Sequence, residues 1–472
     1  MMHDADKVID QALSILKKKP LDGYEVYLQQ VSHFYVESKD GKVDTLKTSH
    51  SLGRAFRILK GERMGFSYTT SGSRLLPASD PSPSQEEGSS GGVDRVIEDA
   101  IHSAEVSSPD PCFDFSPPLK SSLPQLPIFD ETLQKVSEKT KIERAILLEE
   151  TARAVDPERI KKVRKASYEE VLTRITLVNS KGLEVSYGDT LTSVSVTAVA
   201  EESGESEVGW DFDFSHFFND LDVKKVGREA GKKALERLGG RRISSGVFPV
   251  LLSNYVASEF LSLLAHSFLA EQVQKGKSHL KGKRGSKFFS PLISIVDDGL
   301  YPNGSSTSPI DGEGIPSQKK LLVTQGEIRG YLYDRYWANR ENISSPGLRV
   351  ESTGNSRRSG IKSPPVIGIS NFYVEPGKDS LAQLMEGLRR GMVVEEVMGL
   401  HTVDPISGDF SLGCSGSWVD RGEKIHPVKS IAVAGNLFNL FRNVVGLGED
   451  FRFFGRAGAP SLMIEGLEIS GS

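Results

Sequence analysis

Alternating stretches that fold back on glycine turns constrain this chain most strongly. Residues 23–38 alternate in polarity and are rich in Tyr, Val and Phe, as strands are. The dipeptide Asp40-Gly41 then supplies the residues that a tight hairpin turn favours. Two further strand-like stretches follow, with another turn expected at Lys60-Gly61-Glu62. Because residues 4–19 have an amphipathic helical pattern, we expect a helix followed by an antiparallel meander.

A second set of strands is expected in the middle of the chain. Residues 174–213 alternate in the same way and turn at Ser180-Lys181-Gly182. Helical periodicity precedes this set at residues 129–154, and a basic helical stretch follows it at residues 223–240. The turn sequence NSKG resembles SKDG in the first set. This resemblance is a weak indication that one architecture is duplicated.

These patterns predict an α+β protein with three domains. Residues 1–110 form an N-terminal helix-plus-antiparallel-sheet domain, with a Ser/Pro/Gly-rich mobile loop at 71–92. A proline-punctuated linker leads into a central α+β domain at 111–240. Residues 241–472 are expected to form a larger, strand-rich domain of peptidase-like type.

Composition excludes several classes of protein. The chain has 472 residues, of which 38% are hydrophobic and 26% charged, as in globular proteins with real cores. No apolar run is long enough for a bilayer span, so no membrane association is expected. The two cysteines are far apart in sequence, which favours a reducing, cytoplasmic setting. A net charge of −5 provides no basic field for nucleic acid.

The stretch LSLLAHSFLAE at residues 261–271 raises the question of a metal site. We interpret it as part of one long apolar helix that carries His266. Glu271 would lie about 140° around that helix from His266, and Glu259 would lie two turns away. Zinc needs three or four converging ligands. We therefore expect His266 to be structural.

Several remote residues could donate to a metal only if the fold brought them together. They are His279, Asp297, Asp298, His401 and Cys414. Sequence alone cannot show such convergence. Asp297-Asp298-Gly299 is more readily a turn at the end of a strand.

The basic stretch at 275–287 is expected to be a solvated loop. It holds five lysines and Arg284 but lacks the interleaved aromatic residues that stack on bases. Gly276-Lys277-Ser278 is similar to the end of a phosphate-binding P-loop, but position 271, where the first glycine is required, holds glutamate. We therefore reject a nucleotide site there.

The loop STGNSRRSG, residues 352–360, is the strongest candidate for a binding loop. Gly354, Asn355, Arg357 and Arg358 could hold an anion or the end of a peptide chain. The alternative is a glycine-shaped turn with exposed arginines. Nucleophilic catalysis has little support, because no Gly-x-Ser-x-Gly elbow occurs and neither cysteine has a histidine near it in sequence.

Taken together, these and other motifs resemble the TldD/PmbA family, long labelled modulators of DNA gyrase. The similarity extends from about residue 24 to the C-terminus. The motifs that carry it are VESKDGKVDTLKTSHSLGRAFRI, VNSKGLEVSY, ISIVDDG, STGNSRRSG with PPVIGISNFYVEPG, GMVVEEVMG, ISGDFSLGCSGSWVDRGE and IAVAGNLFNLFRNVV. Singly none is specific, but together they are.

The resemblance implies a choice between two branches. The TldD branch carries a His-Glu-x-x-x-His helix and a later cysteine, and is a zinc metallopeptidase. In this chain the spacing to ISIVDDG places Leu261 at the first histidine, Ser262 at the catalytic glutamate and His266 at the second histidine. Gly446 falls near the position of the cysteine, whereas Cys414 lies outside it. The chain therefore resembles the PmbA branch, also called TldE, which lacks these ligands.

The resulting expectation is a subunit that binds no zinc itself and is inactive alone. It would pair with a zinc-bearing TldD-type peptidase as a heterodimer, or with a second copy of itself, and act on peptides or unfolded proteins. Peptides could be held by main-chain hydrogen bonds to strand edges of the C-terminal half. Two alternatives stay open: a self-sufficient metallopeptidase built around His266, and a gyrase-linked or nucleic-acid-binding protein, which the acidic balance disfavours.

Overall fold

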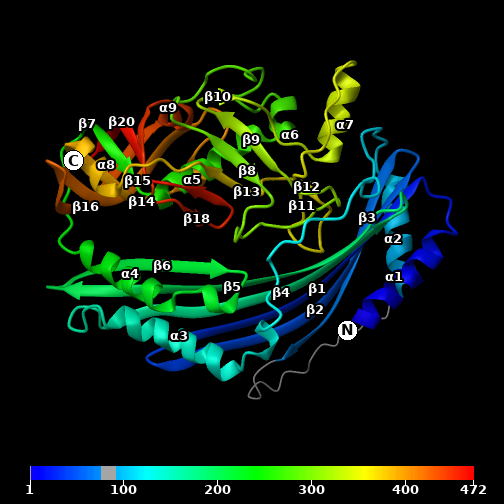
Figure 1. The fold of residues 1–472 in the computed structure, drawn as a ribbon, viewed down its shortest axis with the longest axis horizontal. Helices are drawn as coiled ribbons and strands as arrows, with labels where there is room; N and C mark the ends of the chain where they lie inside the picture. Colours follow the sequence, from blue (N-terminus) through cyan, green and yellow to red (C-terminus); the bar gives the residue numbers. More distant parts are fainter. Residues whose placement is uncertain (1, 76–91, 472) are drawn as a thin grey trace.

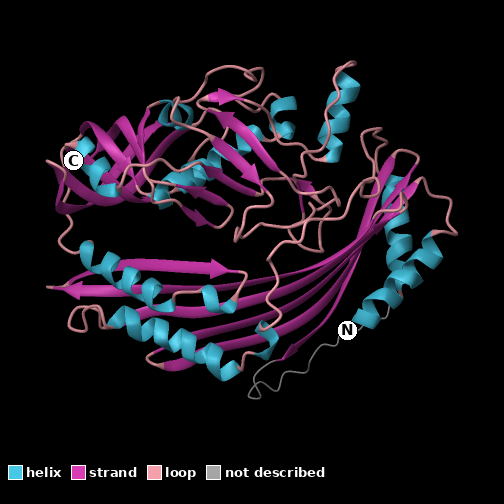
Figure 2. Cartoon of the chain, viewed as in Figure 1, coloured by secondary structure: helices cyan, strands magenta, loops and turns pink. Residues whose placement is uncertain are grey.

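The fold is α+β, as predicted, and consists of two halves of different build (Figure 1). The computed structural model describes residues 2–75 and 92–471. The first half is one long, curved antiparallel sheet with helices on one face. The second half is a body of short strands and helices that lies over the opposite face (Figure 2).

The first half repeats one unit twice: a helix, three antiparallel strands and a second helix. The first unit comprises α1 (Met2–Leu16), β1 (Gly23–Lys39), β2 (Lys42–Lys60), β3 (Arg63–Leu75) and α2 (Val93–Val106). The second unit comprises α3 (Glu138–Arg153), β4 (Lys162–Asn179), β5 (Glu184–Glu202), β6 (Glu205–Ser215) and α4 (Val223–Glu236). The strand order is β3-β2-β1-β4-β5-β6, so β1 and β4 join the two units into one sheet.

In both units a helix packs closely on a glycine of the third strand, which supports the duplication that the turn sequences indicated. A Cβ atom added to Gly65 of β3 would lie 2.0 Å from the carbonyl oxygen of Ala100 in α2. A Cβ atom added to Gly209 of β6 would lie 2.2 Å from the backbone nitrogen of Ala234 in α4. In both units the third strand therefore needs glycine, because the following helix sits directly on its backbone.

The predicted turns are present. Asp40 and Gly41 join β1 to β2 with φ values of 53° and 70°, and Gly61 and Glu62 join β2 to β3 with 58° and 60°. Positive φ at both central residues is the hairpin geometry whose twist matches that of the strands. Gly182, with φ of 89°, turns β4 into β5.

Two features of the structure bear on the predicted domain division, namely the shared sheet and the extent of β3. Residues 1–110 and 111–240 contribute neighbouring strands to a single sheet, so the two segments share a core element. The mobile loop expected at 71–92 is wrong for residues 71–75, which belong to β3 and pair with β2. Residues 76–91 of that loop lie outside the described residues.

The second half contains two six-stranded sheets and a small ribbon. The first sheet has the order β16-β15-β14-β7-β20-β17, with an additional β16–β20 pairing that closes the strands on themselves, and the second has the order β10-β9-β8-β13-β19-β18. Its strands are β7 (Gly246–Leu252), β8 (Ile295–Asp298), β9 (Lys319–Thr324), β10 (Glu327–Ile328), β11 (Ser356–Arg357), β12 (Val366–Ile367), β13 (Asn371–Val374), β14 (Arg390–Met398), β15 (Asp409–Asp420), β16 (Glu423–Asn436), β17 (Val444–Leu447), β18 (Arg452–Phe454), β19 (Ala457–Ala459) and β20 (Leu462–Ser470). Its helices are α5 (Asn254–Ala265), α6 (Ala270–Gln274), α7 (Arg335–Ser344), α8 (Leu381–Leu388) and α9 (Leu437–Arg442).

Helix α5 packs into the main core of the second half. Its Phe260, Leu261 and Leu264 are fully buried among side chains of both large sheets. Removal of this aliphatic and aromatic surface from water is the main stabilising contribution to this half. No helix of the described residues is long and apolar enough to cross a membrane.

The prediction of one continuous helix through residues 261–271 is wrong. Helix α5 ends at Ala265, a single 3₁₀ turn follows at His266–Phe268, and α6 begins at Ala270. The break arises from tertiary pairing: Leu332 donates a hydrogen bond to the carbonyl oxygen of Phe268 and accepts one from the N–H of Ala270. His266 and Glu271 therefore lie on different helical segments.

Buried His216, just after β6, joins the two halves. Its Nδ1 lies 2.7 Å from the carbonyl oxygen of Thr190 and 3.0 Å from a carboxylate oxygen of Asp189, and its Nε2 lies 3.1 Å from the carbonyl oxygen of Gly304. Both ring nitrogens face hydrogen-bond acceptors, an arrangement that favours the protonated ring. Burial alone would lower the pKa of His216, but the contacts with Asp189 and the two carbonyl oxygens outweigh it and raise the pKa.

Candidate functional site

The positions that correspond to a zinc helix do not form a metal site. Leu261 is fully buried in the core, Ser262 is exposed and His266 is half-buried at the end of α5. Among the described residues, the His266 ring has no hydrogen-bond or ion-pair partner, and Glu271 pairs with Lys275 at 2.6 Å. One imidazole without a second ligand or a neighbouring carboxylate does not fit zinc.

Gly446 lies away from these residues. A Cβ atom added to Gly446 of β17 would lie 3.0 Å from Leu384 of α8 and 3.2 Å from Met463 of β20. Leu462 and Ile464, which flank Met463 in β20, belong instead to the core that contains α5. Because successive side chains of a strand point to opposite faces, Gly446 faces the side of the sheet opposite to Leu261 and His266.

The remote donors are also dispersed. His279 stacks on Phe438 with ring centroids 4.6 Å apart, Cys414 is buried in the core, and His401 is exposed on a 3₁₀ turn. Asp297 pairs with Lys320 at 2.7 Å, and Asp298 ends β8 at the predicted turn. Within residues 2–75 and 92–471, no group of three or more His, Cys, Asp or Glu side chains could hold a metal ion.

The basic stretch at 275–287 is largely exposed, as predicted for a solvated loop. Lys283 lies over the ring of Phe288 at 4.0 Å, and Arg284 donates to the carbonyl oxygen of Arg329. Ser278 is buried and donates to the carbonyl oxygen of Ser267. The serine of the sequence Gly276-Lys277-Ser278 therefore has a structural role.

The loop at 352–360 is partly buried: residues 354–356 are buried, and Arg357 and Arg358 are half-buried rather than exposed. Gly354 has φ of 71°, and a Cβ atom there would lie 2.8 Å from the carbonyl oxygen of Pro316. Asn355 is fully buried and donates to Asp297 and to the carbonyl oxygen of Gly368. Gly354 and Asn355 therefore shape the loop and fix it to its neighbours.

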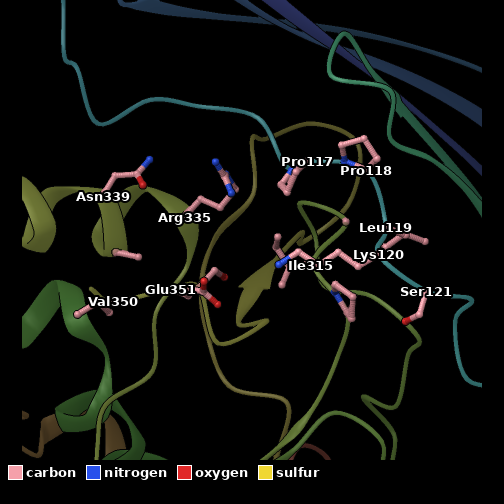
Figure 3. Close-up of a pocket in the computed structure, with 14 residues that line it drawn as sticks. Pro117, Pro118, Leu119, Lys120, Ser121, Ile315, Arg335, Asn339, Val350 and Glu351 are labelled. Atoms are coloured by element: carbon pink, nitrogen blue, oxygen red, sulfur yellow. The ribbon is translucent and has the colours of Figure 1, made fainter. Parts of the chain in front are cut away.

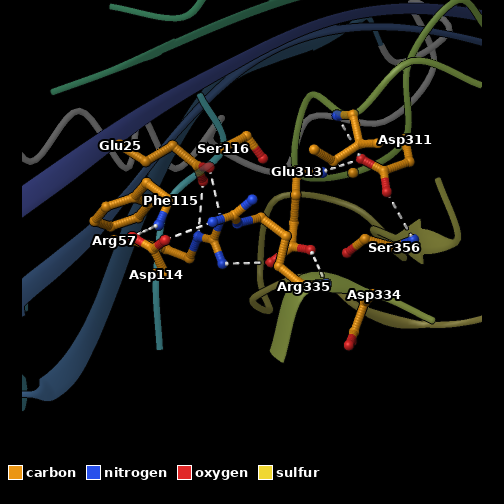
Figure 4. Close-up of polar contacts among 12 residues, drawn as sticks. Glu25, Arg57, Asp114, Phe115, Ser116, Asp311, Glu313, Asp334, Arg335 and Ser356 are labelled. Atoms are coloured by element: carbon orange, nitrogen blue, oxygen red, sulfur yellow. Dashed lines mark hydrogen bonds and ion pairs between the residues drawn. The ribbon is translucent and has the colours of Figure 1, made fainter. Parts of the chain in front are cut away.

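Arg358 enters a buried ion network between the two halves. Figure 4 shows Glu25, Arg57 and Glu313 of this network. Arg57 of β2 lies opposite Glu25 of β1 and donates to both of its carboxylate oxygens, at 2.8 and 2.6 Å. Arg358 donates to the same carboxylate and, from Nε, to the carbonyl oxygen of Gly312 at 2.7 Å. Burial alone would raise the pKa of Glu25, but the two guanidinium groups outweigh it and lower the pKa.

Glu313 and Arg335 extend this network on the side of the second half. Glu313 lies 3.4 Å from Arg57 and accepts a hydrogen bond from the backbone N–H of Arg335 at 3.2 Å. The side chain of Arg335 donates to Asp114 of the linker, which also pairs with Lys181. These ion pairs and hydrogen bonds therefore connect the linker and both halves at one place.

Two buried carboxyl groups beside the network have raised pKa values. Asp311 accepts hydrogen bonds from the backbone N–H groups of Glu313, Ile315 and Ser356, yet burial and the charge of Glu313 raise its pKa to about 6. Asp334 caps α7, and burial followed by the charge of Glu313 raises its pKa to about 7. These groups therefore titrate near neutral pH.

Two cavities flank the network. The first, of about 320 Å³, is mainly apolar and lies between the linker and the start of α7 (Figure 3). Pro118 and Leu119 of the linker, Ile315 and Val350 are among its lining residues. Such a groove could hold an apolar side chain.

The second cavity, of about 220 Å³, lies between the sheet of the first half and the loops of the second. Arg357 and Arg358 line it together with Arg456, Tyr187 and the loop at 305–308. Sequence reasoning found the first two residues and missed the others. Arg456 is 99 positions from Arg357, and its only local signal is a single cation in the glycine-rich run FGRAG.

Comparison with known proteins agrees with this architecture. Three consecutive domain descriptions match: PmbA/TldA metallopeptidase domain 1 over residues 24–104, the central domain over 131–238 and the C-terminal domain over 245–471. The metalloprotease PmbA of Escherichia coli O157:H7 is 26% identical over 98% of this chain and 96% of its own length. A TldD homolog of Haemophilus influenzae is 28% identical over 66% of this chain and 65% of its own.

Solved structures show the same fold along the whole chain. A proposed modulator of DNA gyrase from Thermotoga maritima superposes with a TM-score of 0.84 at 27% identity, covering 98% of this chain and all of the other. TldE from Thermococcus kodakarensis superposes with a TM-score of 0.83 at 21% identity, covering 99% of this chain and all of the other. With a continuous match across three domains, the chain belongs to the PmbA/TldD family of metallopeptidase-related proteins.

Proposed function

We propose that this chain is the PmbA-like, or TldE-like, subunit of a two-component zinc metallopeptidase and has no zinc site of its own. The observation that carries the proposal is the environment of Leu261 and Ser262. The family resemblance assigns these positions to a zinc ligand and a catalytic base. Here the first is an aliphatic side chain buried in the core and the second is a hydroxyl without basicity.

The partner in this proposal is a TldD-type subunit with an intact His-Glu-x-x-x-His helix and cysteine. That subunit would supply zinc, which polarises the peptide carbonyl and activates water. This chain would enclose and position a peptide or an unfolded segment. The proposal needs no metal ligand from residues 261–271 or from Gly446.

Strand edges in this chain differ in their availability to such a peptide. The outer carbonyl oxygens of β6 are occupied: Arg237 donates to that of Val208, Lys233 to that of Trp210, and Arg452 to that of Phe212. Occupied edge groups cannot pair with another strand. We therefore do not place peptide binding by strand addition at β6, and keep the sequence-based prediction of an edge of the second half, such as β10 or β18.

Co-expression with a TldD-type subunit tests the proposal. We expect a 1:1 complex by size-exclusion chromatography with light scattering, and one zinc ion per pair by elemental analysis. A stoichiometric zinc ion in the isolated chain, together with peptide hydrolysis, would contradict it.

Replacement of His266 separates the proposal from a self-sufficient enzyme. The proposal predicts that His266→Ala leaves hydrolysis by the complex within about twofold of the wild type, because the ring has no partner in the part of the chain that the structure describes. A metallopeptidase built around His266 would lose activity completely. Ser262→Ala, four residues earlier in α5, serves as a matched control, since its side chain is exposed.

A further inference from the structure

The second cavity brings together cations that the protein itself does not neutralise. It lies under the inner face of β1, β4 and β5, and Tyr187 of β5 is part of its wall. The loop at 305–308, β11 and Arg456 close it from the second half. Its volume of about 220 Å³ is below that of sites for drug-sized ligands, so it fits a small group or a chain end.

Arg357 has no carboxylate partner among the described residues. Its Nη2 donates to the hydroxyl of Ser370, and its Nε is buried without an acceptor. Gly368 leaves room for the side chain, because a Cβ atom there would lie 3.1 Å from Cγ of Arg357. The guanidinium group is thus held in place while its charge is not balanced.

Arg456 provides a second cation of the same kind. Within the described part of the chain, its side chain has no hydrogen-bond or ion-pair partner, and it lies exposed at the margin of the cavity. Desolvation and, after it, the positive charge of Arg357 lower the pKa of Arg456. Both side chains line this one cavity.

The two carboxyl groups of the same cavity face other groups. Asp189 Oδ1 lies 3.0 Å from Nδ1 of His216, but it is buried and accepts no hydrogen bond within the described residues. Asp311 accepts three backbone hydrogen bonds, which satisfy its oxygen atoms within its own loop. Neither acid is paired with Arg357 or Arg456.

Other donors in the cavity wall also lack acceptors. Ser356 Oγ and Arg358 Nη1 are buried and have no hydrogen-bond partner within the described residues. The hydroxyl of Tyr187 has none there either, and burial raises the pKa of Tyr187, so the phenol keeps its proton. A buried donor without an acceptor lowers the stability of the folded state. A single bound group with several oxygen atoms would supply acceptors to all of these donors.

We propose that Arg357 and Arg456 form an anion site that takes the C-terminal carboxylate of a peptide. Paired guanidinium groups match the two oxygens of a carboxylate in geometry and charge. The choice of a peptide end as the source of the carboxylate rests on the proposed function. Inorganic phosphate shares the chemistry and is distinguished by experiment.

Isothermal titration calorimetry on the isolated chain tests the site without any peptidase partner. The probes are N-acetyl-tetraalanine with a free carboxylate, the same peptide with a C-terminal amide, and inorganic phosphate, all at low salt. We expect the free acid to bind at least tenfold more tightly than the amide. We also expect Arg456→Gln and Arg357→Gln each to weaken binding of the free acid at least tenfold.

Arg228→Gln on the exposed surface of α4 is the matched control and should change the affinity less than twofold. Arg456→Lys, which keeps the charge without the planar fork, should bind with intermediate affinity. Equal binding of acid and amide, or an unchanged affinity in Arg456→Gln, would overturn the proposal. Binding of phosphate without binding of the free acid would overturn the assignment to a chain end. Failure of the two-subunit proposal would not alter these titrations, because they need no hydrolysis.

Discussion

Arg357 and Arg358 are neighbours in one loop, yet they lie in opposite electrostatic environments. Arg358 shares the carboxylate of Glu25 with Arg57, and the three groups are almost fully buried. Among the described residues, Arg357 donates only to the hydroxyl of Ser370, and Arg456 of the same cavity has no partner. The comparison therefore separates a cation that holds the two halves together from the cations that the proposed anion site would use.

The largest expected effect comes from breaking the paired region. Arg358→Gln removes one of the two guanidinium groups from Glu25 and leaves two buried carboxylates, Glu25 and Glu313, with Arg57 as their one remaining arginine partner in this network. Breaking a buried ion pair from one side costs about 3 kcal/mol or more in the free energy of unfolding. Chemical denaturation measures this loss. Arg357→Gln is the matched control, and an equal loss there would contradict the distinction between the two arginines.

Asp334 provides the next largest effect. Because its folded pKa is raised to about 7, the folded state holds more protons than the unfolded state between pH 4 and 7. Stability therefore falls as the pH rises through this range. Asp334→Asn keeps the helix cap and removes the charge, so it should raise the free energy of unfolding at pH 8 by about 2 kcal/mol. Denaturation at pH 5 is the control, where wild type and variant should differ less.

His216 gives a smaller effect of the same sign. Its folded pKa is raised, so its stabilisation is fully present below the unfolded pKa and is lost as the pH rises through the folded pKa. His216→Gln should therefore cost about 1 kcal/mol more at pH 6 than at pH 8. Unfolding curves at the two pH values measure the difference. An equal loss at both would show that the ring is neutral in the folded protein.

The smallest effect is expected at Arg456. Its side chain is exposed and has no hydrogen-bond or ion-pair partner within residues 2–75 and 92–471, so Arg456→Gln should change the free energy of unfolding by less than about 0.5 kcal/mol. The same variant should lose binding of the free-acid peptide. A large loss of stability in denaturation experiments would instead assign Arg456 to the paired region.

Local signals in the sequence are sufficient to predict many of the turns and strands of the fold. The hairpin turn at Asp40-Gly41 follows from residue preferences alone, and the strands beside it follow from alternation. The break after Ala265 could not be predicted, because the apolar pattern continues through Phe268 and Leu269 without Gly or Pro. It depends on pairing with Leu332, which is more than sixty positions away.

The same limit applies to the candidate sites. The sequence indicated that the loop at 352–360 was unusual, but its two arginines could not be told apart there. Their difference is decided by Glu25 of β1, which reaches Arg358, and by Arg456, which lies beside Arg357. Both contacts cross the boundary between distant segments, so no local pattern contains them.

The rate of hydrolysis of an unstructured peptide by separate and mixed subunits tests the central proposal most directly. The samples are this chain alone, a zinc-bearing TldD-type subunit alone, and an equimolar mixture of the two. The account predicts no hydrolysis by this chain, and a rate in the mixture that rises to a maximum at a 1:1 ratio. Hydrolysis by this chain alone, or a mixture no faster than the TldD-type subunit, would contradict it.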